Sequence, residues 1–192
     1  MHAIYQLPEH QLGRYRQHLL NLDLESRRMR FGFTASDHAI NQICDKIEQD
    51  AKAHNIFVIE NSELAVVAAG HVAVFDGKME LAFSVLSDHR RCGMADSLMH
   101  RCLQWCQNRS LLQGQMVCLP TNTAMRSLAK KHGITVTSYD DESESVINLP
   151  SANLFTFLGE AYDTNAATLD HLGKLQSNFA QTAIKNLTFS IK

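Results

Sequence analysis

The stretch Met79-Glu80-Leu81-Ala82-Phe83-Ser84-Val85-Leu86-Ser87-Asp88-His89-Arg90-Arg91-Cys92-Gly93-Met94-Ala95 decides the fold. The run from Lys78 to Leu86 is rich in Val, Leu, Ala and Phe, which predicts a β-strand. From Cys92 to Arg109 the apolar side chains follow helical spacing; they are Ala95, Leu98, Met99, Cys102, Leu103 and Cys106. The chain therefore passes from a strand into a helix through a tight loop.

Two hairpin turns precede this strand. Asn61-Ser62 and Asp76-Gly77 are turn dipeptides between apolar runs, which predicts an antiparallel meander. Its three strands are Asn55 to Glu60, Glu63 to Phe75 and Lys78 to Leu86. Further upstream, the sequence predicts a short strand from His2 to Leu7 and helices from Glu9 to Leu22 and from Asp37 to His54.

The segment after the helix continues the alternation of strands and helices. A strand from Gln115 to Leu119 is followed by a helix from Thr123 to His132, with Thr121 or Asn122 as N-cap and Gly133 just past its end. Two more strands, Ile134 to Ser138 and Ser145 to Leu149, flank an acidic turn at Asp140 to Glu142. The prediction is an α/β fold whose mixed sheet is antiparallel first and then contains a βαβ unit.

The C-terminal segment forms a helical extension. We assign residues 1–150 to one domain and residues 151–192 to this extension, which we expect to consist of two helices broken near Asp163 to Asn165. Its apolar residues, among them Leu154, Phe155, Leu158, Leu169, Leu172 and Phe179, need a surface to cover them. The extension either packs on the domain or pairs with another subunit to give a homodimer.

Charge and cysteine content limit the classes of partner. The chain has 18 Lys plus Arg against 20 Asp plus Glu, a formal charge of −2, so we expect neither nucleic acid nor a membrane as partner. The polar N-terminal residues and the absence of a long apolar run predict a cytoplasmic protein. Five scattered cysteines without a Cys-x-x-Cys pair predict reduced thiols and no metal site.

The start of the helix after Arg91 has the chemistry of an anion site. A helix N-terminus presents unpaired N–H groups and the positive end of the helix dipole, which favours a diphosphate. Gly93 allows close approach of the backbone, and Arg90 and Arg91 add positive charge. The alternative is a glycine at a helix start beside two solvated arginines.

Two blocks resemble the GNAT family of N-acetyltransferases. Arg90 to Ala95 is similar to its Gln/Arg-x-x-Gly-x-Gly/Ala motif, which follows a strand like the one ending at Leu86. Asn122 to Ile134 is similar to the second motif of that family, at the right distance downstream. The resemblance implies the GNAT-type fold, in which a mostly antiparallel sheet is flanked by helices. It also implies transfer of an acetyl group from acetyl-CoA to an amine of a small molecule or a protein.

The resemblance also implies a set of coenzyme-binding residues. Backbone groups of Val85 and Leu86, at the end of the strand that includes Phe83, would hold the pantetheine arm. The loop and helix start would hold the pyrophosphate through Arg90, Arg91, Cys92, Gly93, Met94 and Ala95. Asn122 would contact the coenzyme near its thiol end, although an N-cap asparagine needs no ligand to explain it.

The reaction needs a base, because an alkylamine with a pKa of about 10.4 is almost fully protonated at pH 7. Glu80 is the catalytic candidate, since it interrupts an apolar strand and matches the base of some GNAT enzymes. In a regular strand it lies about 17 Å from Val85, so it would act at the far side of the acceptor or through water; alternatively it simply faces solvent. The family's usual acid, a tyrosine, is replaced by Ala129. Either Tyr139 or Tyr162 substitutes for it, or the thiolate leaves unassisted, or the enzyme is weak.

Two further points stay open at this level. Glu25 to Phe31 joins the first two helices and contains three arginines, which either grip an anionic group of the acceptor or are solvated. The alternatives to an enzyme are a non-catalytic acyl-CoA-binding or regulatory module, which the missing tyrosine favours, and an assembly protein that uses its C-terminal helices.

Overall fold

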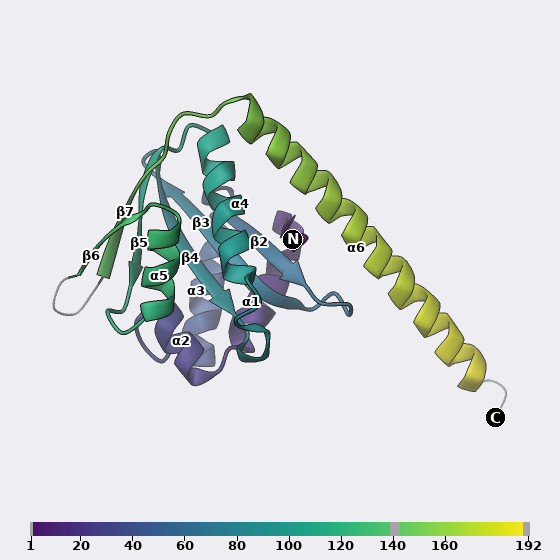
Figure 1. Ribbon diagram of the computed structural model, residues 1–192. Helices are drawn as coiled ribbons and strands as arrows, with labels where there is room; N and C mark the ends of the chain where they lie inside the picture. Colours follow the sequence, from purple (N-terminus) through teal and green to yellow (C-terminus); the bar gives the residue numbers. More distant parts are fainter. Residues whose placement is uncertain (1, 139–142, 190–192) are drawn as a thin grey trace.

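Seven strands form one sheet in the part of the chain that the computed structural model describes, residues 2–138 and 143–189 (Figure 1). Their order is β1-β2-β3-β4-β5-β7-β6, and every pair is antiparallel except β4 with β5. This confirms the predicted mixed sheet with one βαβ unit. The strands are β1 Tyr5–Gln6, β2 His54–Glu60, β3 Val66–Phe75, β4 Lys78–Val85, β5 Gln113–Cys118, β6 Thr135–Ser138 and β7 Ser143–Asn148.

The helices cover both faces of this sheet. They are α1 Leu12–Leu20, α2 Leu24–Phe31, α3 Asp37–Gln49, α4 Met94–Asn108, α5 Thr123–Lys131 and α6 Leu154–Phe189, with short 3-10 turns at Glu9–Gln11, Ala51–Ala53 and Ser87–His89. Gly133 has a left-handed φ of 71° just beyond α5, as the sequence predicted. The predicted helices before residue 150 are present, with ends that differ by a few residues.

Alternation along the strands builds two separate cores. Ile56 and Val58 of β2 point toward α1 and α3, whereas Phe57 and Ile59 point toward α4. The predicted face of α4 is buried, with Leu98, Met99, Cys102 and Cys106 fully covered. The sheet is therefore the middle of three layers, with α1 to α3 on one side and α4 and α5 on the other.

The parallel pair β4 and β5 separates soon after it begins. Its register includes only Met79 with Gly114 and Glu80 with Gln115, although β4 continues to Val85 and β5 to Cys118. Gly114 is required at the contact, because a Cβ there would lie 2.1 Å from the Met79 carbonyl oxygen. Beyond Glu80 the two strands diverge and leave one edge of β4 without a strand partner.

The segment from Glu25 to Phe31 is a helix, α2, and not only a connection as we expected. Asp23 caps its start by accepting the Ser26 N–H at 2.7 Å, and Gly32 ends it with a φ of 81°. Arg27 holds the helix in place, since its guanidinium donates to the carbonyls of Leu22, Ala35 and Leu20. The two caps were present in the sequence as Asp23 and Gly32.

The C-terminal extension is one continuous helix, α6, so the predicted break near Asp163 to Asn165 is wrong. Thr164 and Asn165 bond back to the carbonyls of Glu160 and Ala161 at 2.8 Å, which lets both residues stay inside a helix. α6 runs diagonally past α4 and β1 (Figure 1). None of the helices among the described residues has the length and apolar composition of a membrane span.

Polar contacts attach α6 to the rest of the protein. Glu160 lies 3.3 Å from Arg101 and 3.0 Å from Arg109 of α4. Further along, His171 contacts the Glu60 carboxylate at 2.8 Å and stacks on Tyr5. The opposite side of α6 exposes its apolar side chains, among them Phe155 at 82% and Phe179 at 76%.

Candidate active site

The loop between β4 and α4 turns sharply at two left-handed residues. Gly93 caps α4 with a φ of 77°, and Arg91 has a φ of 62°. His2 braces this loop by donating a hydrogen bond from Nε2 to the Cys92 carbonyl at 2.8 Å. The first N–H groups of α4 are thereby presented at the end of β4, as the sequence predicted from Gly93.

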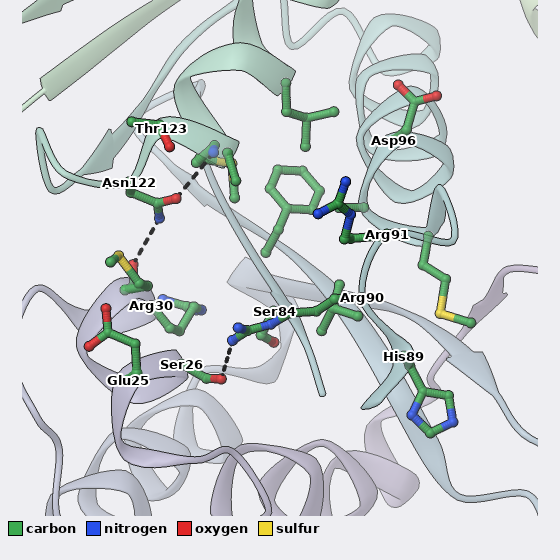
Figure 2. Close-up of a pocket in the computed structure, with 18 of the residues that line it drawn as sticks. Glu25, Ser26, Arg30, Ser84, His89, Arg90, Arg91, Asp96, Asn122 and Thr123 are labelled. Atoms are coloured by element: carbon green, nitrogen blue, oxygen red, sulfur yellow. Dashed lines mark hydrogen bonds between the residues drawn. The ribbon is translucent and has the colours of Figure 1, made fainter. Parts of the chain in front are cut away.

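A cavity of about 540 Å³ lies in front of this helix start, where β4 and β5 have separated. In Figure 2, Glu25, Ser26 and Arg30 lie on the α2 side of the cavity, and Arg91 and Asp96 on the α4 side. The beginning of α5 contributes the remaining wall through Asn122, Thr123 and Met125. Three segments distant in sequence thus form one pocket.

Most of the predicted coenzyme-binding residues line this pocket. They are Phe83, Val85, Arg90, Arg91, Gly93, Met94, Ala95 and Asn122. Leu86 and Cys92 are not among the lining residues. The Leu86 N–H donates to the Val67 carbonyl at 3.0 Å, so this donor is already used and does not face a ligand.

The backbone of β4 points toward the pocket at alternate residues. Leu86 donates to Val67 of β3, and in an antiparallel ladder hydrogen-bonded pairs alternate with pairs that are not bonded to each other. Val85, which is opposite Ala68, belongs to a pair of the second kind, so its N–H and C=O groups point away from β3. The same geometry applies to Phe83, opposite Gly70. Because the ladder with β5 ends at Glu80, the backbone groups of Phe83 and Val85 face the gap between the strands.

Three arginines that have no carboxylate partner among the described residues line the pocket. The sequence has ten arginines, and six of them form ion pairs with Asp or Glu. Within residues 2–138 and 143–189, the arginines without such a pair are Arg30, Arg90, Arg91 and Arg126, and the first three line the pocket. Arg90 bonds instead to the neutral Ser26 hydroxyl (Figure 2). The pocket is suited to an anion.

Asn122 is the N-cap of α5, one of the two positions predicted for that role. Its Oδ1 accepts the Met125 N–H at 3.1 Å, and its Nδ2 reaches the Met29 carbonyl at 3.5 Å. These contacts tie α5 to α2 across the pocket. The side chain has a structural function, and its position in the pocket wall leaves contact with a ligand as a prediction.

Ser84 and His18 form a buried pair at the pocket floor. His18 Nδ1 lies 3.0 Å from the Val66 carbonyl, which only accepts, so Nδ1 has the proton and Nε2 accepts from the Ser84 hydroxyl at 2.8 Å. Burial lowers the pKa of His18 to about 4, and the charge of Arg30 adds to this effect. Since an imidazolium is destabilised here, the pair is better suited to fixing β4 on α1 than to activating a nucleophile.

Glu80 is on β4 but outside the main pocket. Its side chain is exposed and lines a separate cavity of about 470 Å³ with Lys78, Gln115 and Glu144. The Glu80 side chain is on the same face of the sheet as the side chains of Ala82 and Ser84. Ser84, which lines the main pocket, lies four residues further along the strand. Burial lowers the pKa of His54, and the charges of Asp50 and Glu80 oppose part of this shift. Glu80 therefore has no direct contact with the Arg-lined pocket.

The structure describes one of the two tyrosines proposed as a substitute acid, and this one does not line the pocket. Tyr139 lies outside the described residues. Tyr162 is on α6, 68% exposed, and lines another cavity with His100 and Lys131. The side chain of Ala129 is buried in the core under α5. The position that aligns with the family tyrosine thus offers no proton donor.

The comparisons with known proteins agree with this geometry. The model of the Acetyltransferase (GNAT) family matches residues 17–134. This chain belongs to the GNAT family. Its matched segment extends from α1 to the end of α5 and includes the whole pocket loop. A sequence search of curated proteins finds no significant match.

Solved structures of other GNAT proteins have the same fold. The GNAT domain of S. lividans PAT superimposes with a TM-score of 0.63 at 16% identity, covering 76% of this chain and 89% of that one. Spermidine N-acetyltransferase from Vibrio cholerae, solved with CoA and spermine, superimposes with a TM-score of 0.60 at 14% identity, covering 76% of this chain and 95% of that one. Ribosomal-protein-alanine N-acetyltransferase from Brucella melitensis superimposes with a TM-score of 0.58 at 14% identity, covering 76% of this chain and 99% of that one. These structures show the shared fold, and it is the family match that makes the chain an enzyme of the acyltransferase class.

Sequence reasoning did not find every residue of this GNAT pocket. Ser26 and Arg30 of α2 and Ser84 of β4 also line it. Ser26 had no local signal, and Arg30 was one of three arginines that the pattern did not distinguish. The residues of the described part contain no group of three or more His, Cys, Asp or Glu side chains placed to hold a metal ion.

Proposed function

We propose that this GNAT protein transfers the acetyl group of acetyl-CoA to a primary amine of a small molecule or protein, by direct attack of the amine on the thioester. The observation that supports this most strongly is the open edge of β4. The backbone groups of Phe83 and Val85 face the cavity next to the N-terminus of α4. A strand edge is suited to a pantetheine amide, and a helix start with Arg90 and Arg91 is suited to a diphosphate.

The same edge supplies donors for the chemistry. The N–H of Val85 points into the gap, where it would stabilise the oxyanion formed when the amine attacks. We assign Gly93, Met94 and Ala95 to the diphosphate through their N–H groups, and Asn122 to the thiol end. A coenzyme thiol has a pKa of about 8.5, so its thiolate leaves without strong acid assistance, in accord with Ala129.

Acetyl-CoA binding and turnover are tested together. We expect calorimetry to detect acetyl-CoA binding well below 1 mM, and thiol release to follow when an amine panel is added. Replacing both Arg90 and Arg91 by Gln should weaken binding about 10-fold or more, while Arg28→Gln on the surface of α2 should not. Absence of binding at 1 mM refutes the proposal. Binding without release across the panel would instead favour the non-catalytic acyl-CoA-binding module.

Glu80 is our candidate base, acting through water because it lies outside the main pocket. The expected effect of Glu80→Gln is a lower rate at low pH, where the amine proton is hardest to remove, with unchanged acetyl-CoA affinity. Glu63→Gln, in the turn before β3, is the matched control. A pH–rate profile of the Glu80 variant that coincides with the wild-type profile would exclude Glu80 from the role.

We also propose that α6 pairs with a second copy of the chain. Its exposed side follows a heptad seam made of Phe155, Leu158, Tyr162, Asn165, Leu169, Leu172, Gln176 and Phe179. The positions directly beside the seam, the e and g positions of the heptad, are all uncharged; they are Leu154, Gly159, Ala161, Ala166, Thr168, Gly173, Leu175, Ala180 and Thr182. Two identical helices can therefore meet without charge repulsion. The exposed apolar side chains amount to on the order of 800 Å² per helix, about what a stable dimer needs.

The dimer is tested by molar mass in solution. Light scattering after size exclusion should give twice the chain mass for the wild type and the chain mass for a Leu169→Glu, Leu172→Glu double variant. Ser177→Glu, at an exposed position of the same helix outside the seam and its flanking positions, should remain dimeric. A monomeric wild type at about 100 µM would contradict the pairing.

We retain the division into a domain of residues 1–150 and an extension of 151–192. The five free cysteines favour a cytoplasmic location.

A further inference from the structure

Arg30 is the arginine of the pocket that lies away from the diphosphate end. It belongs to the last turn of α2 and enters the pocket from that side (Figure 2). Its guanidinium contacts His71 of β3. His71 is opposite Ala82 of β4, and Ala82 comes two residues before Ser84. Arg91, by contrast, lies on the α4 side of the pocket, whereas Arg90 follows the end of the strand and bonds to Ser26 of α2 (Figure 2). The reacting end of a thioester held along Phe83 and Val85 would therefore point toward Arg30, away from the start of α4.

The hydrogen bonds of Arg30 do not neutralise its charge. Nη2 donates to the Tyr15 hydroxyl at 3.2 Å and to His71 Nδ1 at 3.4 Å. Nε is buried and has no hydrogen-bond partner in the described part of the chain. Glu25 lines the same pocket but pairs with Arg28 at 3.0 Å. Of the five N–H donors of a guanidinium, several remain for a ligand.

The other arginines of α2 are fully engaged in structural contacts. Arg27 donates to three backbone carbonyls and pairs with Asp37 at 2.6 Å. Arg28 is on the surface with Glu25. Arg30 has fewer acceptors than Arg27 and no carboxylate partner among the described residues, so part of its guanidinium is free to donate to a ligand in the pocket.

A rigid support fixes the Arg30 guanidinium. Because the guanidinium only donates, His71 Nδ1 accepts and His71 Nε2 donates to His54 Nδ1, 2.9 Å away. Burial lowers the pKa of His71 well below its ordinary value, and the Arg30 charge adds to this, so His71 is neutral at pH 7. Tyr15 is 2% exposed. The support orients the cation without supplying negative charge, which is the preorganisation that a binding residue needs.

We propose that Arg30 binds a carboxylate of the acceptor, so that the acceptor is an amine that also has a carboxylate, as in an amino acid. This inference rests on the proposed function. An ammonium group alone would be repelled by Arg30, whereas a carboxylate beside the amine pairs with the guanidinium and offsets that repulsion. The pairing would also place the amine next to the thioester end of the pocket.

The test compares acceptors that differ only in the carboxylate. Amino acids with increasing amine–carboxylate separation are compared with the corresponding amides, both in thiol release and in calorimetric binding to the CoA-loaded protein. For at least one acid we expect the wild type to prefer it over its amide by about 10- to 100-fold in kcat/KM or in affinity. Arg30→Gln should abolish that preference, Arg30→Lys should keep part of it, and Arg28→Gln should keep all of it.

The outcomes separate this inference from the proposed function. Equal use or equal binding of every acid and its amide by the wild type overturns the Arg30 inference, whatever the turnover. A preference that survives in Arg30→Gln, with its melting temperature unchanged, overturns it as well. Loss of acetyl-CoA binding in the wild type would instead remove the proposed function. Selective binding of an acid without turnover would support the Arg30 site and contradict catalysis.

Discussion

Acidification should destabilise this protein through His18. The side chain is 1% exposed and donates to the Val66 carbonyl while accepting from Ser84. Burial lowers its pKa from 6.5 to about 4. Above pH 6.5 the ring is neutral in both the folded and the unfolded state. Below pH 6.5 only the unfolded state takes up the proton, so the free energy of unfolding falls as the pH drops toward 4.

The size of this effect follows from the pKa difference. Each pKa unit corresponds to 1.36 kcal/mol, so the shift from 6.5 to about 4 amounts to about 3 kcal/mol in full. By pH 5 about 2 kcal/mol of it is lost. His71 and His54 are also partly or fully buried with lowered pKa values, so the total acid sensitivity is larger. A comparison between variants is needed to isolate the contribution of His18.

The assay is urea unfolding at pH 7 and pH 5 for the wild type and His18→Gln. The variant should lose about 2 kcal/mol less on acidification than the wild type, even if it is less stable at pH 7. His38→Gln, an exposed position on α3, should behave like the wild type. The ring proton of His18 should also titrate near pH 4 by NMR. Equal acid sensitivity of wild type and His18→Gln would refute the argument.

Three further substitutions test the scaffold by chemical unfolding. Gly114→Ala should cost about 3 kcal/mol or prevent folding, because its Cβ would lie 2.1 Å from the Met79 carbonyl oxygen; a neutral effect would contradict the close parallel contact. Gly93→Ala should cost about 1 kcal/mol through its φ of 77° alone, since nothing lies within 4 Å of the added Cβ, and a stabilised variant would disagree. Glu160→Ala should cost about 3 kcal/mol because it leaves Arg101, whose side chain is 4% exposed, without its carboxylate; a loss below about 1 kcal/mol would show that α6 depends little on this pair.

The α6 prediction shows where local pattern failed. Asp163, Thr164 and Asn165 are weak helix formers, and the sequence suggested a break there. Thr164 accepts a bond from Arg101 at 3.0 Å, and both Thr164 and Asn165 bond back along the helix. Docking on α4 therefore outweighs the low helix propensity. The overlooked α2 had the opposite cause, because its signals at Asp23 and Gly32 were local and were not used.

Sequence by itself determined the strands, most of the helices and the loop between β4 and α4. The period of the apolar residues, the turn dipeptides, Gly93 and the Asn122 cap depend on near neighbours in the chain, so a single sequence contains them. Only the tertiary structure decided which backbone groups of β4 face the pocket, since that depends on register with β3 and separation from β5. It also joined Arg30 to His71, 41 positions away, and His18 to Ser84, 66 positions away. Such contacts follow from the packing of whole helices on the sheet, which no local pattern specifies.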